Sequence, residues 1–60
     1  MNARRQAIQE LNENNYFFKR AGTNHDIYVN SETGYIIPVK RDFKDRDLKI
    51  IRWEIKKGGR

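Results

Sequence analysis

The sequence predicts an α+β domain with the element order α-β-β-β-α, in which a three-stranded antiparallel sheet carries both helices on one face. Apolar residues recur at the roughly 3.6-residue spacing of a helix near both ends of the chain. Between them lie three short segments rich in aromatic and β-branched residues, separated by glycine-containing turns. At 60 residues, the chain is expected to form one domain, residues 1–60, with a small core.

The first helix is predicted from four apolar residues that share one side of a helical wheel: Ala3, Ala7, Ile8 and Leu11. Asparagine tolerates the left-handed backbone conformation at which helices often stop. We therefore expect this helix to end at Asn14-Asn15.

Three strands are expected over residues 16–20, 25–29 and 35–39. The cluster Gly22-Thr23-Asn24 breaks the first from the second, and residues 30–34 form a hairpin loop with Gly34 where a positive φ is wanted. Pro38 lacks an amide donor, which suits a strand end or a sheet edge. The aromatic residues of these strands are expected to be mostly core, although an outward Tyr28 or Tyr35 could stack on a base.

The last helix is predicted to begin near Asp45 or Asp47, either of which can cap the first amides, and to end at residues 58–59. Its core stripe, spaced i, i+3, i+7, consists of Leu48, Ile51 and Ile55.

Ile50 and Trp53 lie together on roughly the opposite side of this helix, where a small two-layer domain usually carries charge. Two interpretations are open. Trp53 could fold over an edge of the sheet, or the pair could be an exposed interface for a protein partner.

Charge and composition narrow the function classes. The formal charge of +5 lies entirely in residues 40–60, and such a basic region favours polyanions, usually nucleic acid, unless it is only a solvated helix surface. The chain has no cysteine, one histidine and no carboxylate cluster, so we expect no metal and no cofactor, and the lack of cysteine is compatible with a reducing cytosol. No apolar run approaches the ~20 residues of a membrane span.

Several catalytic patterns are missing from the sequence. It has no glycine-rich phosphate loop before a helix, no serine or cysteine triad, and no His-Glu-x-x-His motif. Nucleotide hydrolysis and proteolysis therefore have no support. The predicted element order is instead that of double-stranded-RNA-binding domains, which read RNA by shape and phosphate contacts.

Residues 18–58 resemble the HicA-type mRNA interferase toxins, small bacterial proteins of the same element order. The resemblance rests on Gly22-Thr23-Asn24-His25 leading into an apolar strand, on the hairpin through Gly34, and on Ile37-Pro38 before a basic segment. Many relatives have an arginine-histidine pair after that proline, whereas this chain has Val39-Lys40-Arg41. A second histidine is therefore missing here.

The resemblance implies a metal-independent endoribonuclease, the toxin of a type II toxin–antitoxin system, that cleaves mRNA in the cytoplasm with His25 as its catalytic residue. It also implies a HicB-like antitoxin that binds the toxin and covers the histidine. The toxin would then be a monomer when free and part of a hetero-oligomer with the antitoxin.

The chemistry of His25 is plausible on general grounds. RNA carries its own nucleophile, the 2′-hydroxyl, and an imidazole is the side chain best suited to move a proton at neutral pH. Four cations are candidates to bind the scissile phosphate: Lys19, Arg20, Lys40 and Arg41. The products would carry 2′,3′-cyclic phosphate ends.

A second interpretation of His25 remains open. It shares strand parity with Ile27 and Val29, so it could be a hydrogen-bonded histidine at the margin of the core, unless a bulge or twist turns it outward. Asp26 should point to the opposite face and is not expected to orient it. Gly22 is expected to serve backbone conformation. We expect Thr23 and Asn24 to stabilise the turn through hydrogen bonds from their side chains to the backbone, although Asn24 could position RNA. On this interpretation the chain is a non-catalytic RNA-binding or antitoxin-binding module.

Overall fold

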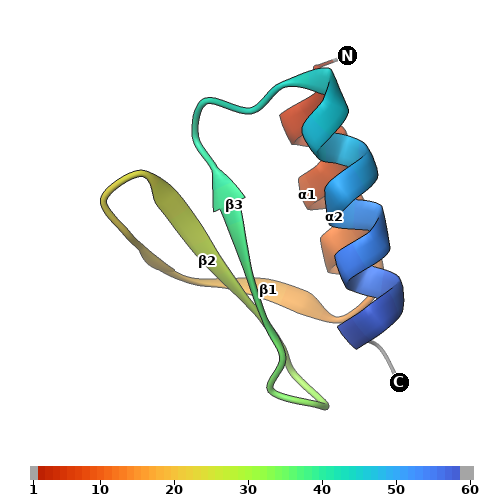
Figure 1. The fold of residues 1–60 in the computed structure, drawn as a ribbon. Helices are drawn as coiled ribbons and strands as arrows, with labels where there is room; N and C mark the ends of the chain where they lie inside the picture. Colours follow the sequence, from red (N-terminus) through yellow and green to blue (C-terminus); the bar gives the residue numbers. More distant parts are fainter. Residues whose placement is uncertain (1, 59–60) are drawn as a thin grey trace.

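The computed structural model describes residues 2–58 and has the predicted element order (Figure 1). The elements are α1 (Ala3–Glu13), β1 (Tyr16–Ala21), β2 (His25–Asn30), β3 (Ile36–Lys40) and α2 (Asp45–Gly58). The predicted fold class is confirmed, and the predicted element ends differ from the observed ones by no more than a residue or two.

The sheet is antiparallel with the order β1-β2-β3, so β2 is its central strand. Both helices lie on the same side of this sheet and pack against each other, α1 next to β1 and α2 next to β3 (Figure 1). One face of the sheet is therefore covered by helices. We call the other the open face.

Burial along the strands shows which residues belong to each face. Tyr28 on β2 and Ile37 and Val39 on β3 are buried against the helices. Their neighbours in sequence point to the open face: Ile27 and Val29 are half-buried, and Ile36 is exposed. Because the open face carries apolar side chains, it is not an ordinary solvated surface.

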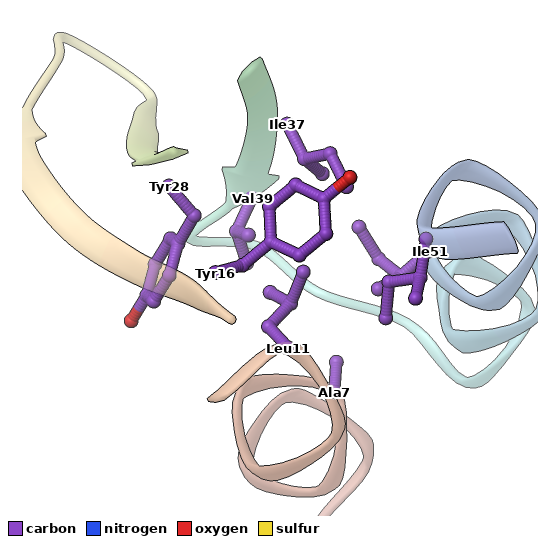
Figure 2. Packing of buried hydrophobic residues seen from close by; sticks show 8 residues of the cluster. Ala7, Leu11, Tyr16, Tyr28, Ile37, Val39 and Ile51 are labelled. Carbon is purple, nitrogen blue, oxygen red and sulfur yellow. The ribbon is translucent and has the colours of Figure 1, made fainter. Parts of the chain in front are cut away.

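The core is built from all five elements (Figure 2). Its buried apolar residues are Ala7, Leu11, Tyr16, Tyr28, Ile37, Val39, Ile51 and Ile55. The predicted helix stripes are thereby confirmed except at Ala3, which is half-buried and lies outside this cluster; Ile8 and Leu48 pack against the core and are only partly buried.

The expectation that the strand aromatics are mostly core is wrong for two of them. Phe17 and Phe18 are 47% and 56% exposed. Only the first residue of β1, Tyr16, is buried. Phe17 pairs with Val29 and points to the open face. Phe18 shares a face with Tyr28 and meets its ring edge-on at a centroid distance of 5.9 Å.

The ends of the elements follow local chemistry. α1 begins where Asn2 Oδ1 accepts a hydrogen bond from the Arg5 amide, and it is followed by Asn15 at φ 71°, the predicted left-handed stop. In the β2–β3 loop, Gly34 has φ 80°, as expected. Asp47 accepts the Lys44 amide at 2.9 Å and so caps α2, as predicted.

Glu10 and Arg52 join the two helices. The Arg52 Nε and Nη2 atoms lie 3.0 and 2.9 Å from Glu10 Oε1 and Oε2, and this hydrogen bonding lowers the pKa of Glu10 from its ordinary value of 4.5. A carboxyl with a lower pKa in the folded state stabilises the fold above its ordinary pKa, and this stabilisation is lost as pH falls through the folded value.

We predict that the free energy of unfolding decreases as the pH is lowered past about 4.5. Glu10→Gln should make this dependence on pH shallower. The measurement is urea unfolding from pH 7 to pH 2. Glu32→Gln is the control, because the Glu32 carboxylate makes no hydrogen bond or ion pair within residues 2–58. Equal slopes for wild type and Glu10→Gln would contradict the prediction.

Gly58 closes α2 against the sheet. It is buried, its carbonyl accepts a hydrogen bond from Thr33 Oγ1 at 3.2 Å, and a Cβ at this position would collide with the Tyr16 hydroxyl and the Tyr35 ring. Only glycine therefore fits here without a shift of the two tyrosines.

We predict that Gly58→Ala destabilises the domain. Overpacking typically costs about 1–3 kcal/mol and outweighs the better helix propensity of alanine, which is at most about 1 kcal/mol. Thermal unfolding measures the effect, with a fall in Tm of about 4–8 °C per kcal/mol in a domain of this size. Lys56→Ala, at an exposed position of the same turn, is the control. A Gly58→Ala variant as stable as wild type would refute the packing described.

Candidate active site

His25 is the first residue of β2, and strand alternation places it on the open face with Ile27 and Val29. The sequence predicted that His25 shares a face with these two residues, at the margin of the core. In the structure this shared face is the open face, which no helix covers. The side chain is half-buried and makes no hydrogen bond or ion pair within residues 2–58. A hydrogen-bonded histidine at the core margin therefore does not describe it, and the imidazole can reach a ligand on the open face.

Lys40 is the cross-strand neighbour of His25 in the β2–β3 pairing. The Arg41 amide donates to Asn24 O at 3.2 Å, so His25 and Lys40 form a pair without mutual backbone hydrogen bonds, the type in which side chains approach most closely. The Lys40 ammonium leans over the sheet edge, where its Nζ lies 3.7 Å from Asp47 Oδ2. Lys40 is thus a neighbour of His25 in the sheet, while its ammonium group forms an ion pair with Asp47 of α2.

A bulge in β1 brings Arg20 to the open face. Phe18 pairs with Tyr28, yet Arg20 pairs with Ile27, so the register shifts by one residue at Lys19. Without the shift, Arg20 would point to the helix side. Lys19 and Arg20 are exposed and make no side-chain hydrogen bond or ion pair within the described residues 2–58. Arg20 and His25 therefore share one end of the open face, and Lys40 lies at its edge.

The turn before His25 depends on a close approach of its backbone. The Gly22 amide donates to His25 O at 2.6 Å, and a Cβ on Gly22 would lie 2.8 Å from that oxygen. Glycine is required here for space. The expected side-chain bonds of Thr23 and Asn24 are not made within residues 2–58; their backbone carbonyls accept hydrogen bonds instead.

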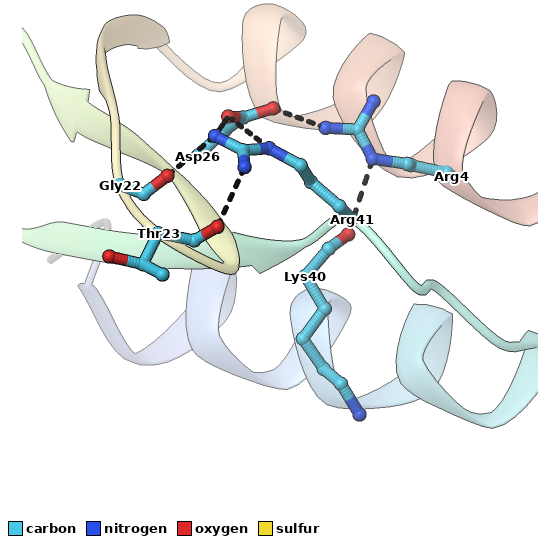
Figure 3. Close-up of polar contacts among 6 residues, drawn as sticks. All are labelled: Arg4, Gly22, Thr23, Asp26, Lys40 and Arg41. Carbon is cyan, nitrogen blue, oxygen red and sulfur yellow. Dashed lines mark hydrogen bonds and ion pairs between the residues drawn. The ribbon is translucent and has the colours of Figure 1, made fainter.

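The donor to this turn is Arg41, which belongs to a group of charges centred on Asp26 (Figure 3). Its Nη2 and Nη1 atoms lie 2.6 and 2.8 Å from Gly22 O and Thr23 O, and its Nε and Nη2 lie 3.2 and 3.1 Å from Asp26 Oδ1. Asp26 Oδ2 accepts from Arg4 Nη2, and Arg4 Nε donates to Lys40 O at 3.2 Å. We call Arg4, Asp26 and Arg41 the Asp26 cluster.

The contacts of the Asp26 cluster bear on two expectations from the sequence, the direction of Asp26 and the role of Arg41. Asp26 points away from the face of His25, as predicted. Arg41 was grouped with the phosphate-binding cations, yet its guanidinium is directed at the turn and at Asp26. No local pattern marks this residue; only the pairing of β2 with β3 brings Arg41 beside residues 22–24.

Two other features are absent from residues 2–58. This part of the chain has no group of three histidine, cysteine, aspartate or glutamate residues able to hold a metal ion. None of its helices is long and apolar enough to cross a membrane.

Ile50 and Trp53 are 55% and 58% exposed, so Trp53 does not fold over the sheet edge. Lys57 Nζ lies 5.0 Å from the centre of the Trp53 ring. Ile50 also lines a groove between β3 and α2, whose lining residues are Pro38, Lys40, Phe43, Asp47, Ile50 and Ile51. The partner interface predicted at Ile50 and Trp53 therefore adjoins Lys40, and it stays a prediction.

We predict that Trp53→Ala changes the free energy of unfolding by less than about 1 kcal/mol, because the ring is exposed and its contact with the Lys57 ammonium is worth roughly 0.5–1 kcal/mol. Ile51→Ala, which empties a buried site, should cost about 2–5 kcal/mol. Urea unfolding compares the two variants. If both lost the same stability, Trp53 would be a core residue.

Comparison with known proteins gives no further identification. No protein-family model matches the chain, and no curated protein or solved structure matches it. The resemblance to HicA-type toxins therefore rests on the residues of this chain alone.

Proposed function

We propose that the chain is the toxin of a type II toxin–antitoxin system, a metal-independent endoribonuclease that cleaves mRNA. The observation that carries this proposal is the position of His25: half-buried on the open face, without a hydrogen bond to the rest of residues 2–58, at the end of a turn fixed by backbone contacts. An imidazole in this position has an accessible nitrogen for a substrate.

His25 acts on the 2′-hydroxyl and the leaving 5′-oxygen of the scissile linkage. The 2′-oxygen attacks phosphorus and the P–O5′ bond breaks, which leaves a 2′,3′-cyclic phosphate and a 5′-hydroxyl. His25 either takes the proton of the 2′-hydroxyl or gives a proton to the departing 5′-oxygen, and water serves in the other role. Arg20 on the open face and Lys40 at its edge contact the phosphates on either side, and Lys19 adds charge beside them. Because RNA supplies the nucleophile, the step needs neither a metal nor a covalent intermediate.

The open face and the neighbouring groove also support a protein partner. Exposed apolar side chains lie on both: Phe17 and Ile36 on the open face, and Ile50 beside the groove. A HicB-like antitoxin seated there would lie beside Lys40 and obstruct His25. The free toxin is then a monomer in the cytoplasm, and the inhibited form is a hetero-oligomer.

A non-catalytic RNA-binding or antitoxin-binding module is the second candidate. It is favoured by one observation: within residues 2–58 no carboxylate or other side chain hydrogen-bonds the His25 imidazole to orient it. In this case the basic residues of the open face bind RNA without breaking it.

We predict that the wild-type protein cleaves a long unstructured RNA in EDTA and leaves 2′,3′-cyclic phosphate ends, and that His25→Ala slows cleavage by at least about 10²-fold. Circular dichroism should show that both proteins are folded, and both should bind RNA equally. Glu32→Gln, in the β2–β3 loop, is the matched control and should keep full activity.

Three outcomes would contradict the proposal. Equal cleavage by wild type and His25→Ala would remove the histidine from the mechanism. Products with only 3′-hydroxyl ends would exclude attack by the 2′-oxygen. Binding of RNA without any cleavage by the wild type would favour the non-catalytic module.

A further inference from the structure

We propose that Arg41 is a positioning residue for His25: it holds the carbonyls of the turn before the histidine and does not bind the phosphates of the substrate. This inference rests on the proposed function and deepens it. It separates Arg41 from Arg20, since both are cations near His25 but only Arg20 is left open to a ligand.

Most N–H donors of the Arg41 guanidinium are hydrogen-bonded within the protein. Four of its contacts are hydrogen bonds to Gly22 O, Thr23 O and Asp26 Oδ1 at 2.6 to 3.2 Å. A guanidinium has five N–H donors, so one remains. A bidentate grip on phosphate needs two donors and would have to break contacts to the turn or to Asp26.

The Arg41 guanidinium also forms an ion pair. Asp26, whose side chain is only 17% exposed, pairs with it through Oδ1 and with Arg4 through Oδ2. Arg4 in turn donates to the carbonyl of Lys40, the residue before Arg41. The guanidinium is thus held by Asp26 as well as by the turn carbonyls, and its planar fork keeps one orientation.

The contacts to the turn determine where the histidine backbone lies. Carbonyls of three successive residues, Gly22, Thr23 and Asn24, accept from Arg41, the last from its backbone amide. The Gly22 amide closes the turn on His25 O at 2.6 Å. With the backbone before and at His25 fixed, only the side-chain rotations of the imidazole remain to be set by the substrate. Misplacement of a reacting group by about 1 Å can cost about 10²-fold in rate.

Two variants separate a positioning role from phosphate binding: Arg41→Gln and Arg20→Gln. We expect Arg41→Gln to lower kcat at least about tenfold, with KM for RNA unchanged. Arg20→Gln should raise KM. It should also make the slope of log affinity against log salt concentration shallower by about one, the change expected for the loss of one phosphate contact. The salt slope is measured with each substitution in the His25→Ala background, so that RNA stays intact.

Arg41→Lys and Arg5→Gln complete the series. Lysine keeps the charge beside Asp26 but lacks the fork, so Arg41→Lys should keep the salt slope and fail to restore kcat. Arg5→Gln removes a positive charge on α1 whose side chain has no polar partner within residues 2–58, and it should keep both activity and stability.

Hydrogen exchange of the Gly22 amide tests the turn without any activity assay. Its bond to His25 O should open at least about tenfold more often in Arg41→Gln than in wild type or Arg5→Gln, while amides in the core of α2 exchange equally in all three. This comparison also shows that Arg41→Gln is folded.

The proposal would be overturned by a salt slope that falls by about one contact in Arg41→Gln, by a raised KM with kcat unchanged, or by unchanged exchange of the Gly22 amide. If the wild type cleaves no RNA, the proposed function fails. Faster exchange of the Gly22 amide in Arg41→Gln would then still establish that Arg41 stabilises the turn before His25. Unchanged exchange would refute this role.

Discussion

The carboxylate of Asp26 is the interaction on which the candidate site depends. Its two oxygens bind arginines from segments that lie far apart in the sequence, Arg4 in α1 and Arg41 just after β3. One side chain of the central strand thereby joins the first helix, the end of the third strand and, through Arg41, the turn that precedes His25. A half-buried carboxylate is tolerated because it is doubly paired, and loss of either arginine would leave one of its two oxygens without an arginine partner.

The Asp26 cluster and His25 lie on opposite faces of the same strand, and this division follows from the size of the chain. Two short helices can cover one side of a three-stranded sheet and no more. The covered side contains the core, whereas the open face keeps apolar residues together with the histidine and its cations. The β1 bulge at Lys19 adds to this division, because it moves Arg20 to the side of His25.

Periodicity was sufficient to predict the fold, since the stripes of α1 and α2, the asparagine stop and the Gly34 turn are all local signals. The helical wheel placed Ile50 and Trp53 opposite the core stripe but left two interpretations open, and the structure shows the exposed one. The errors concern properties that depend on pairing. Phe17 is exposed because its pairing with Val29 places it on the open face, and Arg41 faces the turn because β3 pairs with β2 in one particular register. Register and strand order are not encoded in any single segment.

The central claim, that the end of the open face around His25 is a ribonuclease site, is tested most directly by NMR mapping of a bound RNA. An oligonucleotide with 2′-O-methyl groups lacks the nucleophile and stays intact during the titration. Our account predicts that amide shifts concentrate at Arg20, His25 and Lys40, together with a shift of the His25 ring signals. Shifts confined to α2, with none at these three residues, would contradict it.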